Sequence, residues 1–324
     1  MSLPSRVSRR TVLGAAAALA ACRRPSGAAA NLSTVTLRVG TYKGGVQHAL
    51  KAAGLDDTPY KIAWAEFAGG NLLTEAIEAR AVDVGSMSEI PPIFVAGRPS
   101  LLRLVAVQKA DVNAQVVLVP KDSPIRSPAE LKGKRVGYVR ATTAQYLLIK
   151  LLAEHGLTLA DVQGVPLSPS DGLSAFGQGS LDAWVIYGVH GSLARARLGA
   201  RVLATGLGRL SGNYVQAALS EALADPPRRA AVIDHLLRSQ KANAWQSTHP
   251  EAWAAVQAQV TGAPAEIFLQ QYRERSGPTA LAPVDEAAIA SQQAVADAFA
   301  KVGSLPAHVD VRPLWTQELN SALA

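Results

Sequence analysis

The sequence contains a single cysteine, Cys22, so no disulfide can form within the chain. Aromatic residues are few, 5% of the 324 positions, and the basic residues are scattered rather than interleaved with them, which argues against a nucleic-acid partner. The six histidines show no metal-ligand spacing, so we expect neither a metal site nor a cofactor. With Cys22 near the N-terminus and no histidine beside a nucleophile, the sequence offers no catalytic constellation.

Apolar residues are abundant, at 48% of the chain, which is enough to form the cores of about two domains without disulfides. The formal net charge is +7. A weak positive field of this kind suits an anionic ligand, although net charge alone identifies no function.

Residues 1–33 have the pattern of an export signal and linker rather than of folded structure. Three arginines precede the apolar run Val12 to Ala21, which is too short to span a bilayer. Residues 8–13 resemble a twin-arginine export motif, and residues 19–22 resemble a lipobox that ends in Cys22. Ordinary cleavage after residues 28–30 is the alternative. We therefore expect a periplasmic protein that is either soluble or attached to the membrane through a lipid on Cys22.

Short segments rich in β-branched residues alternate with helical segments along most of the chain. Strands are expected at residues 34–40, 60–67, 82–85, 101–107, 115–119, 135–139, 164–167, 183–187, 202–204 and 213–219, with helices between most of them. This order predicts an α/β fold with mainly parallel sheets flanked by helices.

The chain divides into two lobes if residues 115–119 and 213–219 are the strands that cross between them. Lobe one is then expected at 34–118 plus 215–324, and lobe two at 119–214. A mostly helical segment from Pro226 to about Lys301 should pack against lobe one. The ligand cleft is expected between the lobes.

Loops of small polar residues follow three expected strands of lobe one, where the strand ends of an α/β sheet bind ligands. The segment Gly85–Pro92 is predicted to open a helix, so that Ser86, Ser88 and the unpaired N–H groups of its first turn face one anion. The loops 42–45 and 68–71 are of the same type, although their glycines are also explained by tight turns.

Several segments, taken together, resemble the aliphatic-sulfonate binding proteins of ABC importers. These segments are residues 39–44, 85–94, 122–125, 130–136, 179–184 and 291–299. The resemblance runs from about Thr36 to Leu314. It implies a two-lobed type II periplasmic-binding fold and a monomer, not an enzyme, that delivers an organosulfonate to an inner-membrane permease. Relatives that bind taurine, nitrate or thiamine precursors, and enzymes on the same fold, are the alternatives.

The resemblance also implies which residues hold the sulfonate-like head group on the lobe-one side. They are Tyr42, Gly44, Gly45, Gly69, Gly70, Asn71, Ser86, Met87, Ser88 and Glu89. Two of these assignments have simpler readings, because the serines could act only as helix caps and Glu89 could cap its own helix. Tyr42 stands where sulfonate binders usually carry glutamine, and it could stack on a larger ligand tail.

On the lobe-two side, the resemblance implies that Thr142 and Thr143 supply the opposing helix N-terminus. Trp184 and Tyr187 would form the wall against the organic tail. The hinge side of the site would be formed by Asn213 or Tyr214. Here too a plainer reading exists, because the two threonines could be caps only and Trp184 could belong to the core.

Overall fold

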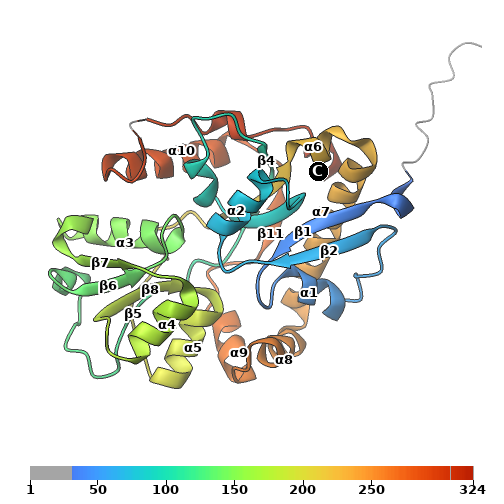
Figure 1. Ribbon diagram of the computed structural model, residues 1–324. Helices are drawn as coiled ribbons and strands as arrows, with labels where there is room; N and C mark the ends of the chain where they lie inside the picture. Colours follow the sequence, from blue (N-terminus) through green and yellow to red (C-terminus); the bar gives the residue numbers. More distant parts are fainter. Residues whose placement is uncertain (1–30, 307, 324) are drawn as a thin grey trace, which may run out of the picture.

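The computed structural model describes residues 31–306 and 308–323. Two sheets with flanking helices form two lobes, and the chain passes between them twice (Figure 1). This confirms the expected α/β two-lobe architecture. The predicted export signal and Cys22 lie outside the described residues, so twin-arginine export and lipidation stay predictions. Within the described part, no helix combines the length and apolar composition needed to cross a membrane.

The first sheet has six strands in the order β11-β4-β10-β3-β1-β2. Its strands are β1 (Thr36–Thr41), β2 (Lys61–Glu66), β3 (Val84–Ser88), β4 (Leu102–Lys109), β10 (Asn213–Leu219) and β11 (Ala280–Ala282). The second sheet has five strands in the order β7-β6-β8-β5-β9. Its strands are β5 (Gln115–Val119), β6 (Arg135–Tyr138), β7 (Gln163–Pro166), β8 (Ala183–Tyr187) and β9 (Arg201–Thr205).

Both sheets are mixed, and for the same reason. In the first, β1 to β4 run in one direction, but β10 lies antiparallel between β3 and β4. In the second, β6 to β9 run in one direction, and β5 lies antiparallel between β8 and β9. The inserted strand is in each case the one by which the chain enters that lobe. The expectation of mainly parallel sheets therefore holds for strand direction but not for these central pairings.

The lobe boundaries differ from those expected from the sequence. Residues 115–118, expected to end lobe one, belong to β5 of the second sheet. Asn213 and Tyr214, expected to end lobe two, begin β10 of the first sheet. The two crossings are thus residues 110–114 and 206–212. Apolar alternation marks a strand, but it does not say which sheet the strand joins.

Helices cover both sheets and carry the core. The α-helices are α1 (Val46–Ala52), α2 (Gly70–Glu78), α3 (Thr143–Glu154), α4 (Pro169–Gly177), α5 (Gly188–Leu198), α6 (Ser220–Ala224), α7 (Pro226–Thr248), α8 (Pro250–Thr261), α9 (Ala265–Arg273), α10 (Glu286–Lys301) and α11 (Asn320–Leu323). Short 3₁₀ helices are Leu32–Thr34, Pro91–Phe94, Pro128–Leu131, Leu159–Asp161 and Arg312–Leu314. In lobe one, α7 and α2 contribute to two separate core clusters, through Leu236 and Ile77 among others.

The C-terminal helices also contact lobe two, on both flanks of the molecule (Figure 1). On one flank the rings of Tyr146 in α3 and Phe299 in α10 stack with centroids 5.8 Å apart. On the other, Leu193 of α5 packs in one cluster with Phe268 of α9. The segment after Pro226 therefore joins the lobes as well as completing lobe one.

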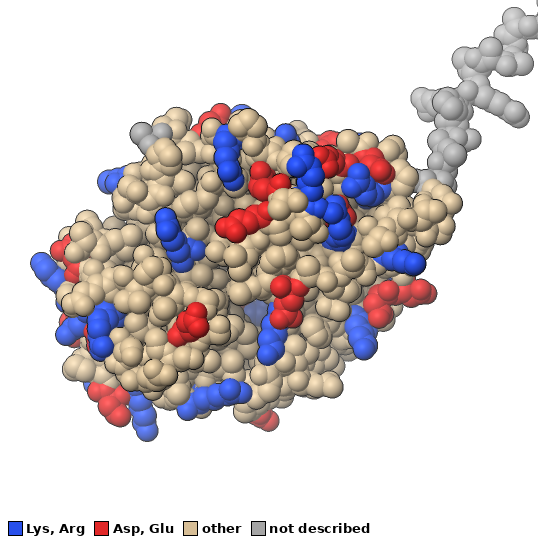
Figure 2. All heavy atoms as spheres, viewed as in Figure 1, with Lys and Arg blue, Asp and Glu red and all other residues tan. Residues whose placement is uncertain are grey.

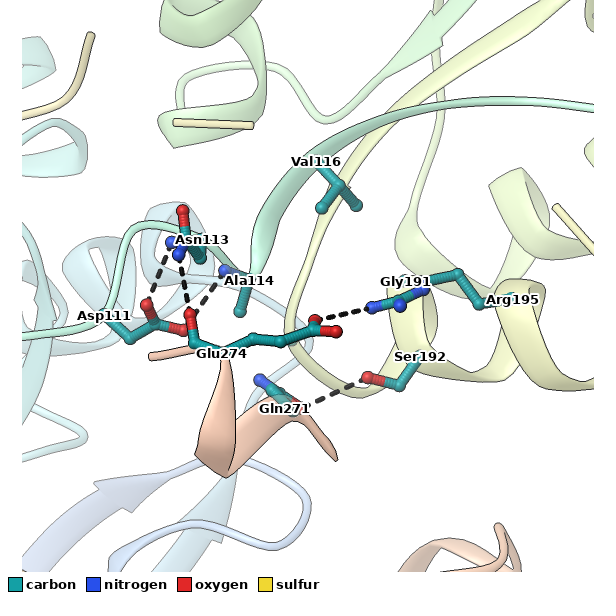
Figure 3. A pocket seen from close by; sticks show the side chains of 10 residues that line it. Asp111, Asn113, Ala114, Val116, Gly191, Ser192, Arg195, Gln271 and Glu274 are labelled. Atoms are coloured by element: carbon teal, nitrogen blue, oxygen red, sulfur yellow. Dashed lines mark hydrogen bonds and ion pairs between the residues drawn. The ribbon is translucent and has the colours of Figure 1, made fainter. Parts of the chain in front are cut away.

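Polar contacts reinforce the junction between α9 and α5 (Figure 3). Arg195 lies 3.4 Å from the carboxylate of Glu274, and the Ser192 hydroxyl donates to the Gln271 side chain at 3.1 Å. The crevice that these residues line measures about 20 Å³, which is room for a water molecule at most. The junction connects the lobes, and this crevice itself offers no space for an organic ligand.

Candidate functional site

A cavity of about 620 Å³ lies between the lobes, within the size range of small-molecule sites. Lobe one contributes the loop after β1, the loop from β2 into α2, and the end of β3. Lobe two contributes the starts of α3, α4 and α5. The wall consists of Tyr42, Lys43, Glu66, Phe67, Ala68, Gly69, Gly70, Met87, Ser88, Pro91, Thr142, Thr143, Ser170, Tyr187, Gly188, Val189, His190 and Tyr214.

On the lobe-one side, α2 begins at the cavity without a side-chain cap. The N–H groups of its first turn have no partner inside the helix, and the positive end of the helix dipole lies there. A Cβ on Gly70 would stand 2.9 Å from Pro91 Cγ and 3.0 Å from Met87 Cβ. Only glycine lets this helix start pack so closely against the end of β3, which brings its amides to the cavity.

Tyr42 closes the same wall with its ring. Its hydroxyl donates to the backbone carbonyl of Ser86 at 2.9 Å, which fixes the ring across the β1–β3 edge. Burial raises the pKa of the Tyr42 hydroxyl, so it remains protonated. Because its proton is already donated, Tyr42 can offer a ligand its ring and an acceptor oxygen.

On the lobe-two side, the threonine hydroxyls are engaged within the protein. Thr142 donates to the Val139 carbonyl at 2.7 Å and accepts from the Ala144 amide at 3.2 Å, so it is the N-cap of α3. Thr143 donates to the Gln115 side chain at 2.7 Å. These contacts leave the backbone amides of the α3 start, rather than the hydroxyl protons, to face an anion.

Two other hydroxyls at the cavity keep their protons available. The buried Tyr187 hydroxyl forms no hydrogen bond of acceptable geometry with a described residue, although the Thr142 side chain lies close enough to act against the rise in its pKa. The Tyr214 hydroxyl accepts from the Gln115 side chain at 3.0 Å, and burial raises its pKa to about 12. A buried hydroxyl without an acceptor is costly, so both tyrosines are suited to donate to a bound acceptor.

The network Thr143–Gln115–Tyr214 also connects the lobes, because Gln115 lies in β5 and Tyr214 in β10. Near it, the two crossings bond to each other through the Ala110 amide and the Gly212 carbonyl at 2.9 Å. Hydrogen bonds at and beside the hinge therefore fix the cavity walls of the two lobes relative to each other.

Charged groups at the cavity are few. Lys43 is exposed and forms no ion pair with any described residue. The pKa of His190 is lowered, first by burial and then by the charge of Lys43. Glu66 is exposed on the lobe-one rim. Over the face in Figure 2, acidic and basic side chains are intermixed without a large patch of one sign. In the described ranges, no group of three or more acidic, histidine or cysteine side chains could hold a metal.

The segment Gly85–Pro92 differs from its expected form. Ser86 and Ser88 lie in β3, and the next element is the short 3₁₀ helix Pro91–Phe94 rather than an α-helix start. Two consecutive prolines lack N–H groups, so this element cannot present the expected row of amides. The backbone amides at the cavity come instead from the starts of α2 and α5. Ser88 reaches the cavity from the end of β3.

Of the sixteen residues that the resemblance implied, nine line the cavity: Tyr42, Gly69, Gly70, Met87, Ser88, Thr142, Thr143, Tyr187 and Tyr214. Gly44, Gly45, Asn71, Ser86, Glu89, Trp184 and Asn213 do not line it. Gly44 faces α8, where its carbonyl accepts from Gln257 at 2.6 Å, and Gly45 is the N-cap of α1. Asn71 lies inside the first turn of α2.

Trp184 belongs to the lobe-two core and not to the cleft wall. It is fully buried and lies 5.9 Å, between ring centroids, from Phe176. A β-strand alternates its faces, so Trp184 points away from the cavity while Tyr187, at the strand end, reaches it.

Glu89 is directed toward the hinge rather than the cavity. Its carboxylate accepts from Ser211, Asn213 and Ser291, and its backbone carbonyl accepts from Gln292 at 2.7 Å. The pKa of Glu89 is raised, mainly by burial. Glu89 therefore joins β3 to the second crossing and to α10, and Asn213 takes part in the same network.

The cavity is also lined by residues that the sequence analysis did not name as ligand-binding: Lys43, Glu66, Phe67, Ala68, Pro91, Ser170, Gly188, Val189 and His190. Of these, Lys43, Ala68 and Pro91 lie in the three segments expected at the cleft. Most of the lobe-two residues in this set belong to the start of α5, a helix that was not predicted from the sequence. A signal existed for Ser170, because Ser168 caps α4 and is followed by proline and then by Asp171 in the first turn.

Comparison with known proteins assigns the family. The model of the NMT1/THI5 like family matches residues 51–209. A protein of Escherichia coli (strain K12) named as an aliphatic sulfonates-binding protein is 34% identical over 294 residues, 89% of this chain and 91% of that protein. The chain belongs to the aliphatic sulfonate-binding protein family. This confirms the resemblance stated above.

Solved structures agree. The alkanesulfonate-binding protein SsuA from Xanthomonas axonopodis pv. citri, bound to MOPS, has 30% identity and a TM-score of 0.79, covering 87% of this chain and 98% of its own. The periplasmic aliphatic sulphonate binding protein SsuA from Escherichia coli has 31% identity and a TM-score of 0.75, covering 86% and 90%. These relatives are binding proteins, so the chain is a member of a periplasmic binding-protein family and not an enzyme.

Proposed function

We propose that this protein captures an alkane- or arylsulfonate in the cavity between its lobes and delivers it to an ABC importer. The observation that supports this most is the convergence of the α2, α3 and α5 starts on one cavity from both lobes. A sulfonate is a permanent anion with three acceptor oxygens. Rigid neutral donors and helix dipoles can bind such an anion without an ion pair.

The remaining wall suits an organic tail and a single negative charge. Phe67, Met87 and Val189 supply apolar surface, and Lys43 places a cation at the rim. If about six hydrogen bonds form, each netting about 1–1.5 kcal/mol, the total corresponds to roughly micromolar affinity. Closure of the lobes would strengthen these bonds by excluding water.

The location and partner are also part of the proposal. The twin-arginine-like residues 8–13 would direct export to the periplasm, and Cys22 would either carry a lipid anchor or be removed with the leader. The protein would act as a monomer that docks to an inner-membrane permease. Mass spectrometry of the native N-terminus tests the anchor, because a start beyond Cys22 would contradict it.

Isothermal titration calorimetry against a panel of small anions tests the ligand. The panel comprises methane-, ethane- and benzenesulfonate, together with taurine, nitrate, sulfate and a thiamine precursor. We expect a sulfonate to bind most tightly, with sulfate and nitrate weaker because they lack an organic tail. Tight binding of another class in the panel would reassign the ligand, and no binding by any sulfonate would overturn the proposal.

A further inference from the structure

We propose that the ligand cleft has a second chamber and that the preferred ligand is an elongated aromatic sulfonate whose tail enters it. This inference rests on the proposed function, because the sulfonate head group would occupy the main cavity. The second chamber measures about 300 Å³ and lies between the start of α5 and helices α7 to α9.

The two chambers adjoin each other. Lys43, Gly188 and Val189 line both of them. Gly188 has a φ of 60°, where the left-handed backbone favours glycine, and a Cβ built on it would meet no atom within 4 Å. Gly188 therefore places no side chain between the two chambers, and of the shared residues only Lys43 and Val189 carry side chains there.

Aromatic side chains line the second chamber, and one of them is fixed in place. Trp253, Phe268 and Tyr272 are among its lining residues, and the first two also pack against neighbouring core clusters. The Tyr272 hydroxyl donates to the Ser247 carbonyl at 2.7 Å, and the Arg275 guanidinium lies 4.7 Å from the centre of the Tyr272 ring. Rigid aromatic walls of this kind suit a planar aromatic tail, because ring pairs gain contact energy at little entropic cost.

The charges in the second chamber disfavour an amine-bearing tail. Arg275 and Lys43 line it and form no ion pair with any described residue. Asp111 also lines it, but its carboxylate already accepts from the amides of Asn113, Ala114 and Ser276. A neutral or anionic aromatic tail is therefore favoured over an ammonium.

The main cavity and the second chamber are mechanically linked through the loop after β1. Gln257 of α8 lines the second chamber and donates to the Gly44 carbonyl at 2.6 Å, next to Lys43. A tail that orders the second chamber would thereby also fix the loop that carries Tyr42 and Lys43.

The test compares a short and a long sulfonate on a variant that fills only the second chamber. Gln246 of α7 lines this chamber and not the main cavity, and no hydrogen bond of its side chain would be lost in Gln246→Trp. Gln240→Trp is the matched control, because Gln240 is exposed on the same helix and lines neither chamber. Binding of ethanesulfonate and of anthracene-2-sulfonate is measured by calorimetry on the full chain.

We expect the wild-type protein to bind anthracene-2-sulfonate more tightly than ethanesulfonate. Gln246→Trp should weaken the aromatic ligand at least about tenfold and leave ethanesulfonate within about twofold, as steric exclusion from a pocket does. Gln240→Trp should change neither. Equal effects of Gln246→Trp on both ligands, or none on either in a variant with unchanged thermal unfolding, would overturn the proposal that the tail binds in the second chamber. Binding of ethanesulfonate alone by the wild type would overturn it while leaving the proposed function intact, whereas binding of neither would contradict the proposed function.

Discussion

The two lobes face the same cavity with different chemistry. Lobe one presents the α2 start, where glycines replace a side-chain cap, and a Tyr42 ring whose proton is already donated. Lobe two presents the α3 start, capped by Thr142, and the α5 start, where the Tyr187 hydroxyl has no described partner. The difference shows that a hydroxyl at a helix start can serve the helix rather than a ligand. At this cleft, glycine amides and tyrosine hydroxyls are the better candidates.

The largest effect should come from adding a side chain where the lobes approach each other. A Cβ on Gly69 of lobe one would lie 2.7 Å from the Asn71 side-chain oxygen, which must shift, and 3.3 Å from the Tyr187 hydroxyl oxygen of lobe two. We expect Gly69→Val to hold the lobes apart and to weaken sulfonate binding about 100-fold, since positional errors of about 1 Å can have effects of this size. Calorimetry measures the affinity.

The unfolding temperature of Gly69→Val should change little, because its φ of −169° is extended backbone that any residue adopts. Gly277→Val is the control, since a Cβ there meets no atom within 4 Å. Wild-type affinity in Gly69→Val would show that the lobes do not need to approach at this point.

Removing one tyrosine hydroxyl from each lobe compares what the two hydroxyls contribute to sulfonate binding. Tyr187→Phe should weaken sulfonate binding about tenfold, the cost of one hydrogen bond to a charged group. Tyr42→Phe should cost less than about threefold, because the Tyr42 proton is donated to the Ser86 carbonyl and not to the ligand. Calorimetry with ethanesulfonate compares the two, and the reverse order would place the free donor in lobe one.

Removing the hydroxyl of Thr142 or of Ser88 should have smaller effects, on stability in the first case and on affinity in the second. Thr142→Ala should lower the free energy of unfolding by about 1 kcal/mol, as loss of an N-cap does, with little change in affinity. Ser88→Ala should leave stability unchanged and weaken binding about threefold, because Ser88 lines the cavity without a described hydrogen bond of its hydroxyl. Denaturant unfolding and calorimetry on both variants check this. A large loss of affinity in Thr142→Ala would mean that its hydroxyl turns to the ligand.

The smallest effect concerns pH. Burial and Lys43 lower the pKa of His190, so it is neutral at pH 7 in the free protein. A bound anion favours the protonated form and raises that pKa, so binding takes up protons and tightens as the pH falls. We expect about a threefold gain between pH 7.5 and about pH 5.5, absent in His190→Gln. A slope that survives in His190→Gln would assign the effect to another group.

Much of the fold was predictable because its signals are local. Periodic apolar segments located nearly all the strands, and β10 was placed at its observed bounds, Asn213–Leu219. What failed was the assignment of β5 to lobe one and of the first two residues of β10 to lobe two, because sheet membership depends on pairing between distant segments. Helix α5 was missed because its glycine-led start resembles a loop and its apolar face is weak in sequence.

The site was only partly predictable, for a related reason. The loops at strand ends were correctly brought to one edge, and Tyr187 and Gly70 lie on the cavity wall. Trp184 lies on the opposite face of its strand, in the core of lobe two. Glu89 lies just beyond the end of β3 and bonds to Asn213 at the hinge. Neighbouring residues in a strand point to opposite faces, so the register decides which of them meets a ligand, and the sequence does not fix it.

A crystal structure of the protein with ethanesulfonate tests the central claim most directly. We expect one sulfonate group in the interlobe cavity, with its oxygens within hydrogen-bond distance of first-turn amides of α2 and of α3 or α5, and of the Tyr187 hydroxyl. A sulfonate held only by Lys43 and His190 at the rim, or by one lobe alone, would contradict it.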